Sequence, residues 1–570
     1  MNKNKKVAKK VLTAVLAASM VMTSGSSVFA AGVGAVTTDE TSERETRNAE
    51  LSMTAATQGM VLLENKDNTL PIADSGNIAL YGGGAYGTVK GGTGSGDVNQ
   101  RYVVNVWDGL KNAGYNITSE DWINEYKTAY DEAAANVNGL FGHVEIEDQE
   151  ITDEQLEASK ADTDTAIYVV ARNSGEGADR TAEPGDYYLT DVEKANIQKL
   201  AENFDKCIVV LNVGGVIDTS FMQEIEGIDS LLLMSQAGMR GGDAVVKVLN
   251  GEVTPSGKLT DTWAKKYVDQ EDYTDGIYVG YRYFDTFGVQ PAYEFGYGLS
   301  YTTFDIAVDS ITADKDNVTV TATVTNTGDT YSGKEVVEVY FSAPDGELEK
   351  PYQELAAFGK TDELAPGQSQ TLTLTYKTTE MSAYSEEKAA YIMEAGDYVV
   401  RVGNSSRNTK VAGVVKLDET AVTEQLSNQV VADKEIKELS KEGATPYTYE
   451  GEADEIAAAP VMELKATDLP SENNASPYDD ESVTAYVSDT TETEYLAENL
   501  EYKLENKYHG AYEEKVEKLE GEFSSATLKD VYDGKITMEE FVSGLTVSEM
   551  ADIVIGGNKI PGAGGQAAGA

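Results

Sequence analysis

Hydrophobic and polar positions change their spacing along this chain. Between about residues 48 and 302, short apolar runs alternate with stretches whose apolar residues recur every three or four positions. Such runs predict strands, and such stretches predict helices. We expect strands at 77–81, 166–171, 207–212 and 230–234, and helices at 48–64, 98–113, 119–135, 189–203 and 242–250. This alternation predicts an α/β domain whose mostly parallel sheet is covered by helices on both faces.

From residue 303 to about 419 the apolar residues recur at every second position instead. Residues 318–326 read VTVTATVTN, and residues 369–376 read SQTLTLTY. Turn sequences such as Asn326-Thr-Gly328 and Pro344-Asp-Gly346 separate these runs. The pattern predicts an antiparallel β-sandwich of the immunoglobulin or fibronectin type III kind.

The N-terminus has the pattern of a signal peptide. Five lysines precede residue 11, an apolar stretch covers residues 11–22, and small residues around Ala30 offer a cleavage site. About 20 apolar residues are needed to span a bilayer, so this stretch is too short. We therefore expect a secreted protein with a signal peptide at 1–30, a mobile leader at 31–47 and no membrane span.

The C-terminal part is acidic and then helical. Residues 420–490 are rich in acidic side chains and poor in aromatic ones, which predicts a linker. A short helical segment is expected over 491–570. Two capping boxes begin helices there, Thr537 with Glu540 and Thr546 with Glu549.

Composition excludes several classes of function. The 570 residues include 97 acidic and 45 basic side chains, and the formal net charge of −52 repels the phosphates of nucleic acids. The single cysteine, Cys207, lies in an apolar run and is expected to be a buried thiol that forms no intrachain disulfide. The two histidines, His143 and His509, are far apart, and no cysteine cluster accompanies them. We therefore predict neither a metal site nor a serine–histidine triad.

A glycine-rich stretch directly after the first predicted strand suggests a dinucleotide site. Gly82 to Gly87 fit G-x-G-x-x-G. However, the loop continues through a second glycine-rich run at 90–96 before a helix can begin. We therefore expect no cofactor, and interpret the glycines as allowing the backbone to approach a ligand or another domain.

The loop after the strand at 166–171 holds the candidate catalytic group. Glu176 lies there between glycines, and ligands bind outside the carboxyl ends of strands in α/β sheets. From the loop alone Glu176 can equally be a solvated glutamate, and Asp179 and Arg180 can simply pair with each other or with neighbours. A second candidate, Ser119-Glu-Asp-Trp122, is interpreted as a helix cap formed by Thr118 and Asp121.

These residues resemble glycoside hydrolase family 3, the family of β-glucosidases and β-xylosidases. The resemblance covers about residues 50–420. Its motifs are Gln58-Gly-Met-Val-Leu-Leu-Glu-Asn65, the run 90–97, Ser174-Gly-Glu-Gly-Ala-Asp-Arg180, Gln236-Ala-Gly238, Pro255-Ser-Gly-Lys-Leu259, Ile277-Tyr-Val-Gly-Tyr-Arg-Tyr-Phe284 and Phe295-Gly-Tyr-Gly-Leu-Ser-Tyr301. The resemblance implies an α/β-sandwich domain at 48–302 and a fibronectin type III-like domain at 303–419.

The resemblance also implies roles for residues. Glu176 would be the general acid/base of a retaining glycosidase, and Asp179 and Arg180 would bind substrate or shape the loop. The family's nucleophile belongs to a (β/α)8 barrel, and no residue of this sequence matches it. Residues 491–570 look like the lead-in to a missing barrel, as in a permuted subgroup of the family.

We therefore predict a β-glucosidase-type hydrolase, acting on terminal sugars of β-glucosides or oligosaccharides, with little or no activity by itself. A retaining enzyme needs two carboxyl groups about 5–5.5 Å apart, and only one is matched. Two alternatives remain. The chain is a non-catalytic, secreted carbohydrate-binding or cell-surface protein, or a barrel domain from another chain completes it.

Overall fold

The computed structural model describes residues 39–73, 75–94, 100–137, 143–144, 146–176, 180–267, 274–428, 436–476, 523 and 525–545. The chain divides into two compact units. One is Ala49–Thr484, and the other combines Met1–Asn48 with Ala485–Ala570. The predicted signal peptide at 1–30 lies outside the described residues. Among the helices that are described, none combines the length and apolar character needed to cross a bilayer.

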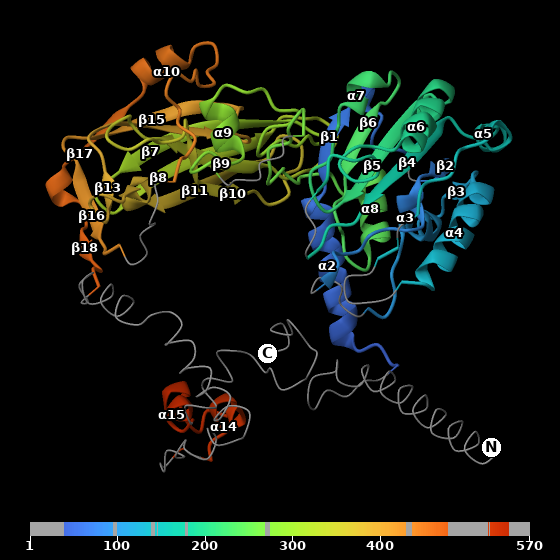
Figure 1. Cartoon of the computed structure of the whole chain (residues 1–570), viewed down its shortest axis with the longest axis horizontal. Helices are drawn as coiled ribbons and strands as arrows, with labels where there is room; N and C mark the ends of the chain where they lie inside the picture. Colours follow the sequence, from blue (N-terminus) through green and yellow to red (C-terminus); the bar gives the residue numbers. More distant parts are fainter. Residues whose placement is uncertain are drawn as a thin grey trace, which may run out of the picture. The chain divides into compact units, whose positions relative to one another are not determined.

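A six-stranded sheet forms the centre of the α/β domain (Figure 1). Its order is β1-β6-β5-β4-β2-β3, and every strand is parallel to its neighbours except β1, which is antiparallel to β6. The central strands are almost wholly buried because helices cover both faces of the sheet. The strands are β1 (Val61–Asn65), β2 (Asn77–Tyr81), β3 (Asn116–Ile117), β4 (Thr165–Arg172), β5 (Lys206–Val213) and β6 (Ser230–Leu233). The predicted mostly parallel sheet is confirmed.

Helices follow the strands, as the alternation predicted. The helices are α3 (Val106–Asn112), α4 (Glu120–Ala134), α5 (Asp153–Lys160), α6 (Asp191–Asn203), α7 (Phe221–Glu224) and α8 (Gly241–Leu249). Right-handed crossovers place α3 on one face of the sheet and α6 on the other. Helix α8 packs against α3 at close range, since a Cβ atom on Gly109 would lie 2.4 Å from the carbonyl oxygen of Gly242.

Two predicted helices have different bounds in the structure. The helix expected at 48–64 is α2 (Glu43–Gly59), and residues 61–64 form strand β1 instead. That prediction was wrong there because the Val61-Leu62-Leu63 run pairs with β6 and is fully buried. The helix expected at 98–113 begins only at Val106, where the side chain of Asn105 accepts a hydrogen bond from the Asp108 N–H at 2.7 Å. Part of the predicted mobile leader also belongs to α2.

A β-sandwich follows, as the two-residue spacing predicted. One sheet has the order β11-β8-β7, and the other has the order β10-β9-β14-β15-β17. Alternate residues of β8, from Val318 to Val324, are buried in the core, while its threonines pair with those of β11. The strands are β7 (Phe304–Ala313), β8 (Asn317–Asn326), β9 (Val336–Ser342), β10 (Glu354–Lys360), β11 (Ser369–Lys377), β14 (Gly396–Gly403), β15 (Thr409–Leu417) and β17 (Val461–Leu464).

The expected linker at 420–490 is wrong for most of its length. Strand β17 pairs in parallel with β15, and α10 (Glu452–Ala458) packs on β15 (Figure 1). A further sheet has the order β12-β13-β16-β18, comprising β12 (Ala383–Ser385), β13 (Ala390–Met393), β16 (Ala421–Gln425) and β18 (Glu472–Asn473). Acidic residues are retained here because they have internal partners, such as Arg401, which lies 2.6 Å from the Glu452 carboxylate. Residues 477–490 lie outside the described residues.

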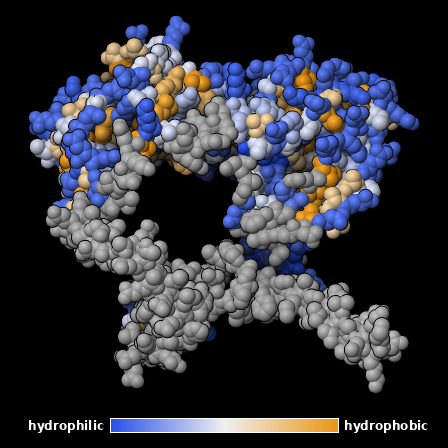
Figure 2. Space-filling view, viewed as in Figure 1, coloured by the Kyte–Doolittle hydropathy of each residue, from blue (hydrophilic) through white to orange (hydrophobic). Residues whose placement is uncertain are grey.

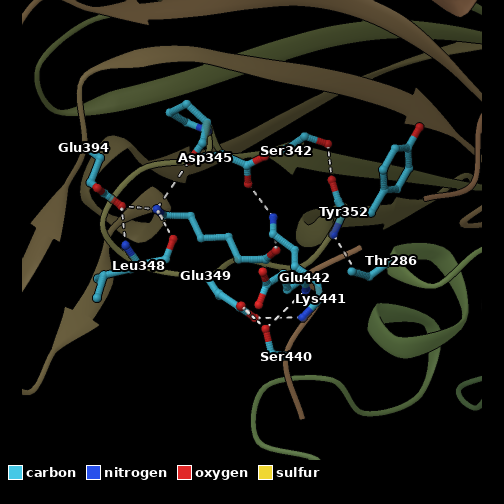
Figure 3. Close-up of polar contacts among 12 residues, drawn as sticks. Thr286, Ser342, Asp345, Leu348, Glu349, Tyr352, Glu394, Ser440, Lys441 and Glu442 are labelled. Atoms are coloured by element: carbon cyan, nitrogen blue, oxygen red, sulfur yellow. Dashed lines mark hydrogen bonds and ion pairs between the residues drawn. The ribbon is translucent and has the colours of Figure 1, made fainter. Parts of the chain in front are cut away.

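Residues 436–444 are held against the sandwich by polar contacts (Figure 3). The Glu349 carboxylate accepts hydrogen bonds from the Ser440 hydroxyl and from the Lys441 N–H, the latter at 3.0 Å. Nearby, Lys350 and Glu394 form an ion pair whose side chains are almost completely buried. These contacts explain why an acidic, proline-containing segment does not behave as a linker.

Two short helices are described near the C-terminus, α14 (Leu528–Tyr532) and α15 (Met538–Ser543). The predicted capping box of Thr537 and Glu540 is present at the start of α15. The box of Thr546 and Glu549, and the helical segment expected before residue 523, lie outside the described residues. On the face drawn in Figure 2, the residues in colour are mainly hydrophilic, as the acidic composition leads one to expect.

Candidate active site

The loop that carries Glu176 leaves the sheet where its strand order reverses. The next parallel strand along the chain after β2 is β3, which lies on one side of β2, and the one after that is β4, which lies on the other side. If the five parallel strands from β2 to β6 are numbered 1 to 5 along the chain, their order in the sheet is 2-1-3-4-5. In such sheets the crevice between the first and third strands, at their carboxyl ends, is the usual ligand site. Strands β2 and β4 lead into the two glycine-rich loops of this chain, at 82–94 and 173–176.

These two loops pack directly on each other through glycines. A Cβ atom on Gly92 would lie 2.2 Å from the Ser174 carbonyl oxygen, and one on Gly175 would lie 2.3 Å from the Thr93 nitrogen. The Glu176 N–H donates to the Thr93 carbonyl at 3.4 Å, and the Glu176 side chain is exposed. The glycines therefore let one backbone support the other directly beside Glu176.

Arg180 holds the Glu176 loop together by binding residues at its start and at its end. Its guanidinium donates to the Ser174 hydroxyl at 2.6 Å, to the Asn173 carbonyl at 3.2 Å and to the Asp186 carboxylate at 2.6 Å. Burial acts to raise the pKa of Asp186, but hydrogen bonds from Thr181 and Arg180 outweigh it and hold that pKa below its usual value. The Asp186 carboxylate is thus ionised and fully engaged, which makes it a structural partner. Asp179, the third predicted site residue, lies outside the described residues.

A buried ion pair anchors the far end of the loop. Arg172, the last residue of β4, binds both carboxylate oxygens of Glu193, at 2.8 and 2.7 Å. It also donates to the carbonyl oxygens of Asp186 and Tyr188. Glu193 completes the capping box of α6 with Thr190. Sequence reasoning missed Arg172, although an arginine that ends an apolar strand ahead of a T-x-x-E box is a readable signal.

Loops from the next two strands complete this edge of the sheet. Asn212, at the end of β5, is fully buried and donates to the carbonyl oxygens of Val89 and Ser235 at 3.0 and 2.7 Å. Gln236 donates to the Ser174 carbonyl at 3.2 Å. The glycine-rich loop, the Glu176 loop and the loop after β6 are therefore bound together at the carboxyl edge.

Buried polar atoms lie at the base of the Glu176 loop. Within the part of the chain that is described, Asn173 Oδ1, Arg180 Nε and the Tyr187 hydroxyl are buried without a hydrogen-bond partner. Tyr187 packs edge-on against Tyr188 and Tyr267, and burial raises its pKa to about 12, so its hydroxyl keeps its proton. Buried polar groups normally have partners, so this edge has unused capacity for hydrogen bonds.

The structure adds one perturbed carboxyl group that the sequence did not indicate. Asp148 accepts hydrogen bonds from the Gly83 N–H, at 3.1 Å, and from the Tyr168 hydroxyl. Burial and the nearby Glu193 carboxylate raise the pKa of Asp148 to about 6. Tyr168 lies in the middle of β4, so the half-buried Asp148 joins the glycine-rich loop to this strand and serves the packing of the loop.

The remaining sequence candidates have structural explanations. Gly82 is in a left-handed conformation, with φ of 90°, and a Cβ atom there would lie 2.5 Å from the Val169 carbonyl oxygen. A single 3-10 turn, Gly83–Ala85, follows Gly82. In a dinucleotide site the glycine-rich turn would lead directly into a helix, so these glycines are better explained by close packing. Helix α4 does begin near Ser119, but the Ser119 hydroxyl binds the backbone of Leu80 and the Thr118–Asp121 cap is not formed. In the described ranges no group of three or more His, Cys, Asp or Glu could hold a metal ion.

Comparison with known proteins identifies the family. Residues 60–301 match the glycosyl hydrolase family 3 C-terminal domain, and residues 335–406 match the fibronectin type III-like domain. The α/β domain of this chain is of the glycoside hydrolase family 3 type. The Glu176 loop lies inside the first match, and the family predicted from the motifs is confirmed.

Several proteins similar to this chain are β-glucosidases. β-Glucosidase A of Butyrivibrio fibrisolvens is 36% identical over 496 residues, which cover 76% of this chain and 58% of that protein. A β-glucosidase of Ruminococcus albus is 37% identical over 389 residues, which cover 65% of this chain and 40% of that protein. The chain thus spans about half the length of the curated relatives it matches.

Solved structures agree. The β-glucosidase of Paenibacillus barengoltzii has a TM-score of 0.66 and 32% identity, with 89% of this chain and 53% of that chain covered. The β-glucosidase 3B of Thermotoga neapolitana, solved in complex with glucose, has a TM-score of 0.61 and 36% identity, with 66% of this chain and 55% of that chain covered.

Proposed function

We propose that this chain supplies the acid/base half of a retaining β-glucosidase-type site that acts on terminal sugars of β-glucosides. Glu176 would protonate the leaving glycosidic oxygen and then deprotonate the attacking water. Arg180 and Asp179 would position the loop. The nucleophilic carboxylate would come from a barrel domain, since no residue of the 570 matches it. The N-terminal pattern supports secretion as the setting for this activity.

One observation carries the proposal. Glu176 lies on a loop at the reversal point of the sheet, within the family 3 match, and other backbone segments hold that loop in place. An acid/base must be held within hydrogen-bond reach of its substrate oxygen, so a braced loop with an exposed carboxylate suits the role. The chain's β-glucosidase relatives support the substrate class.

A chimera tests this proposal. Residues 49–476 would replace the matched portion of the Butyrivibrio fibrisolvens enzyme, and turnover would be measured on cellobiose and on 2,4-dinitrophenyl β-glucoside. We expect turnover by the chimera and a loss of about 100-fold or more on cellobiose with Glu176→Gln. The loss should be much smaller on the dinitrophenyl glucoside, because its leaving group departs without protonation.

The matched control is Glu183→Gln, which makes the same change at an exposed glutamate of the same loop. This control should keep full turnover on both substrates. A folded chimera without turnover, or equal losses on the two substrates with Glu176→Gln, would contradict the acid/base role. The 570-residue chain assayed alone should show little turnover, and activity that Glu176→Gln abolishes would contradict the need for a barrel.

A non-catalytic, carbohydrate-binding role is the second candidate. It is favoured by the engagement of Asp186, because hydrogen bonds from Arg180 and Thr181 occupy this carboxylate and make it unsuitable as a second catalytic group. Calorimetric titration with glucose and cello-oligosaccharides separates the two. Tight binding without turnover in the chimera would support the binding role.

A further inference from the structure

A cleft lies between the α/β domain and the sandwich, apart from the Glu176 loop. It has a volume of about 480 Å³ and is formed by the last turns of α2, the end of α8 with the following loop, and residues 330–334 of the sandwich. None of its lining residues belongs to the segment 165–190. Ligand sites commonly have volumes of about 300–1,000 Å³ and occur at domain interfaces.

The charges that line the cleft cancel. Two lysines, Lys247 and Lys334, are matched by two glutamates, Glu252 and Glu363. Lys247 and Glu252 are already paired with each other. Neither an anion nor a cation would gain net attraction from such walls, and the net charge of −52 repels anions in addition. The cleft therefore suits a neutral ligand.

The walls of the cleft carry hydroxyl and ammonium groups that can still form hydrogen bonds with a ligand. The Thr54 hydroxyl donates to the Glu50 carbonyl at 2.9 Å, and the Thr57 hydroxyl donates to the Thr54 carbonyl at 2.8 Å. Each hydroxyl oxygen keeps lone pairs that can accept. Lys334 provides three protons, one of which goes to Gln58 Oε1 at 3.2 Å. Acceptors and donors thus face the same space.

One aromatic ring gives the cleft an apolar surface. Tyr331 lines it, and its ring centre lies 5.8 Å from that of Tyr301, at an angle of 58° between the ring planes. The Tyr301 ring therefore packs against the Tyr331 ring and supports it from one side. A flat apolar surface beside many donors and acceptors matches a sugar ring, which has hydroxyls at its rim and C–H groups on its faces.

The two walls are joined firmly. Lys360 donates to the Gln58 carbonyl at 3.1 Å, and Lys258 pairs with Glu335 at 2.9 Å across the domain boundary. The side chains of the second pair are 11% and 8% exposed. A site between fixed walls loses less ordering entropy when a ligand binds.

We propose that this cleft is a second binding site, for a neutral mono- or disaccharide, that works without the Glu176 loop. It goes beyond the proposed hydrolase function and does not depend on it. Such a site would hold a carbohydrate chain on the domain pair while its end is processed elsewhere, or would bind it with no processing at all.

The test uses calorimetric titration of the 570-residue chain with cellobiose and with gluconate as the anionic comparison. We expect cellobiose to bind and gluconate to bind at least about tenfold more weakly. Tyr331→Ala should weaken cellobiose binding by about tenfold, and Ser332→Trp should abolish it by filling the cleft. Tyr391→Ala, at a tyrosine 40% exposed on β13, and Glu176→Gln should both leave binding unchanged.

Hydrogen exchange locates the bound sugar. Cellobiose should protect the amides of 247–256 and 330–334. Protection confined to 173–190, full binding by a folded Tyr331→Ala variant, equal binding of gluconate, or no binding by the native chain would each overturn the proposal. The failure of the Glu176 chimera would leave this outcome unaffected, so the two proposals are separately testable.

Discussion

Glu338 places a carboxylate at the joint between the α/β domain and the sandwich. It lies on β9, is 4% exposed, and accepts a hydrogen bond from the Tyr340 hydroxyl at 2.6 Å. Burial raises its pKa to about 7. The Tyr340 hydrogen bond and Lys258 oppose this rise, while Glu335 and Glu294 add to it. The group therefore titrates near neutral pH inside a well-packed interface.

The sign of the effect follows from proton binding. The ordinary pKa of this carboxyl is 4.5, so between pH 4.5 and about 7 the folded protein binds more protons at Glu338 than the unfolded chain does. Stability therefore falls as the pH rises through this window. At 1.36 kcal/mol per pKa unit, the loss is about 3 kcal/mol once the pH exceeds 7.

Glu338→Gln removes this titration and keeps an oxygen that can accept the Tyr340 hydroxyl. The variant should match the native chain at pH 4.5 and be more stable by up to about 3 kcal/mol at pH 8. Scanning calorimetry at both pH values measures this, at about 2–4 °C in Tm per kcal/mol. Glu380→Gln, at an exposed glutamate, should have no effect at either pH. An equal difference at pH 4.5 and 8 for Glu338→Gln would refute the reasoning.

Two further predictions concern the α/β domain. Arg172→Met should lower the free energy of unfolding by about 3–5 kcal/mol, because it leaves the Glu193 carboxylate buried and unpaired. As the control, Lys194→Met breaks the exposed pair with Glu224 and should lower it by less than about 1 kcal/mol. Gly109→Ala should cost about 1–3 kcal/mol, because its Cβ would contact Gly242 and force α3 away from α8. Urea denaturation measures all three variants, and equal losses for the two cations or a more stable Gly109→Ala would contradict these assignments.

The sheet could be predicted because its strands are continuous apolar runs between polar helices. The failure at Val61–Asn65 has a physical cause. An apolar run at the end of an amphipathic helix fits either state, and only the pairing of β1 with β6 decides between them. That pairing joins segments about 170 residues apart, as between Val61 and Leu233, and local spacing carries no information about it.

The segment after residue 420 failed for a different reason. An acidic composition with few aromatics ordinarily predicts a solvated chain, because such residues bury little apolar area. Here Glu452 finds Arg401 and Tyr352 in the sandwich, and Glu349 holds the backbone at Lys441. The partners lie elsewhere in the sequence, so composition alone could not show that these charges are satisfied.

In the candidate site, too, local features could be predicted and contacts between distant segments could not. The Glu176 loop was predictable because its residue types and its place after a strand are local features. Its support was not predictable, because Thr93 and Gln236 reach it from the loops after β2 and β6, and Asn212 at the end of β5 joins those two loops to each other. The reversal of strand order brings those loops together, so it is the topology, more than any one motif, that makes this edge the candidate site. It follows that changes at Asn212, far from Glu176 in sequence, or at the buried Arg172 at the end of β4 should alter the position of that carboxylate, while changes at exposed charges such as Glu183 on the loop itself should not.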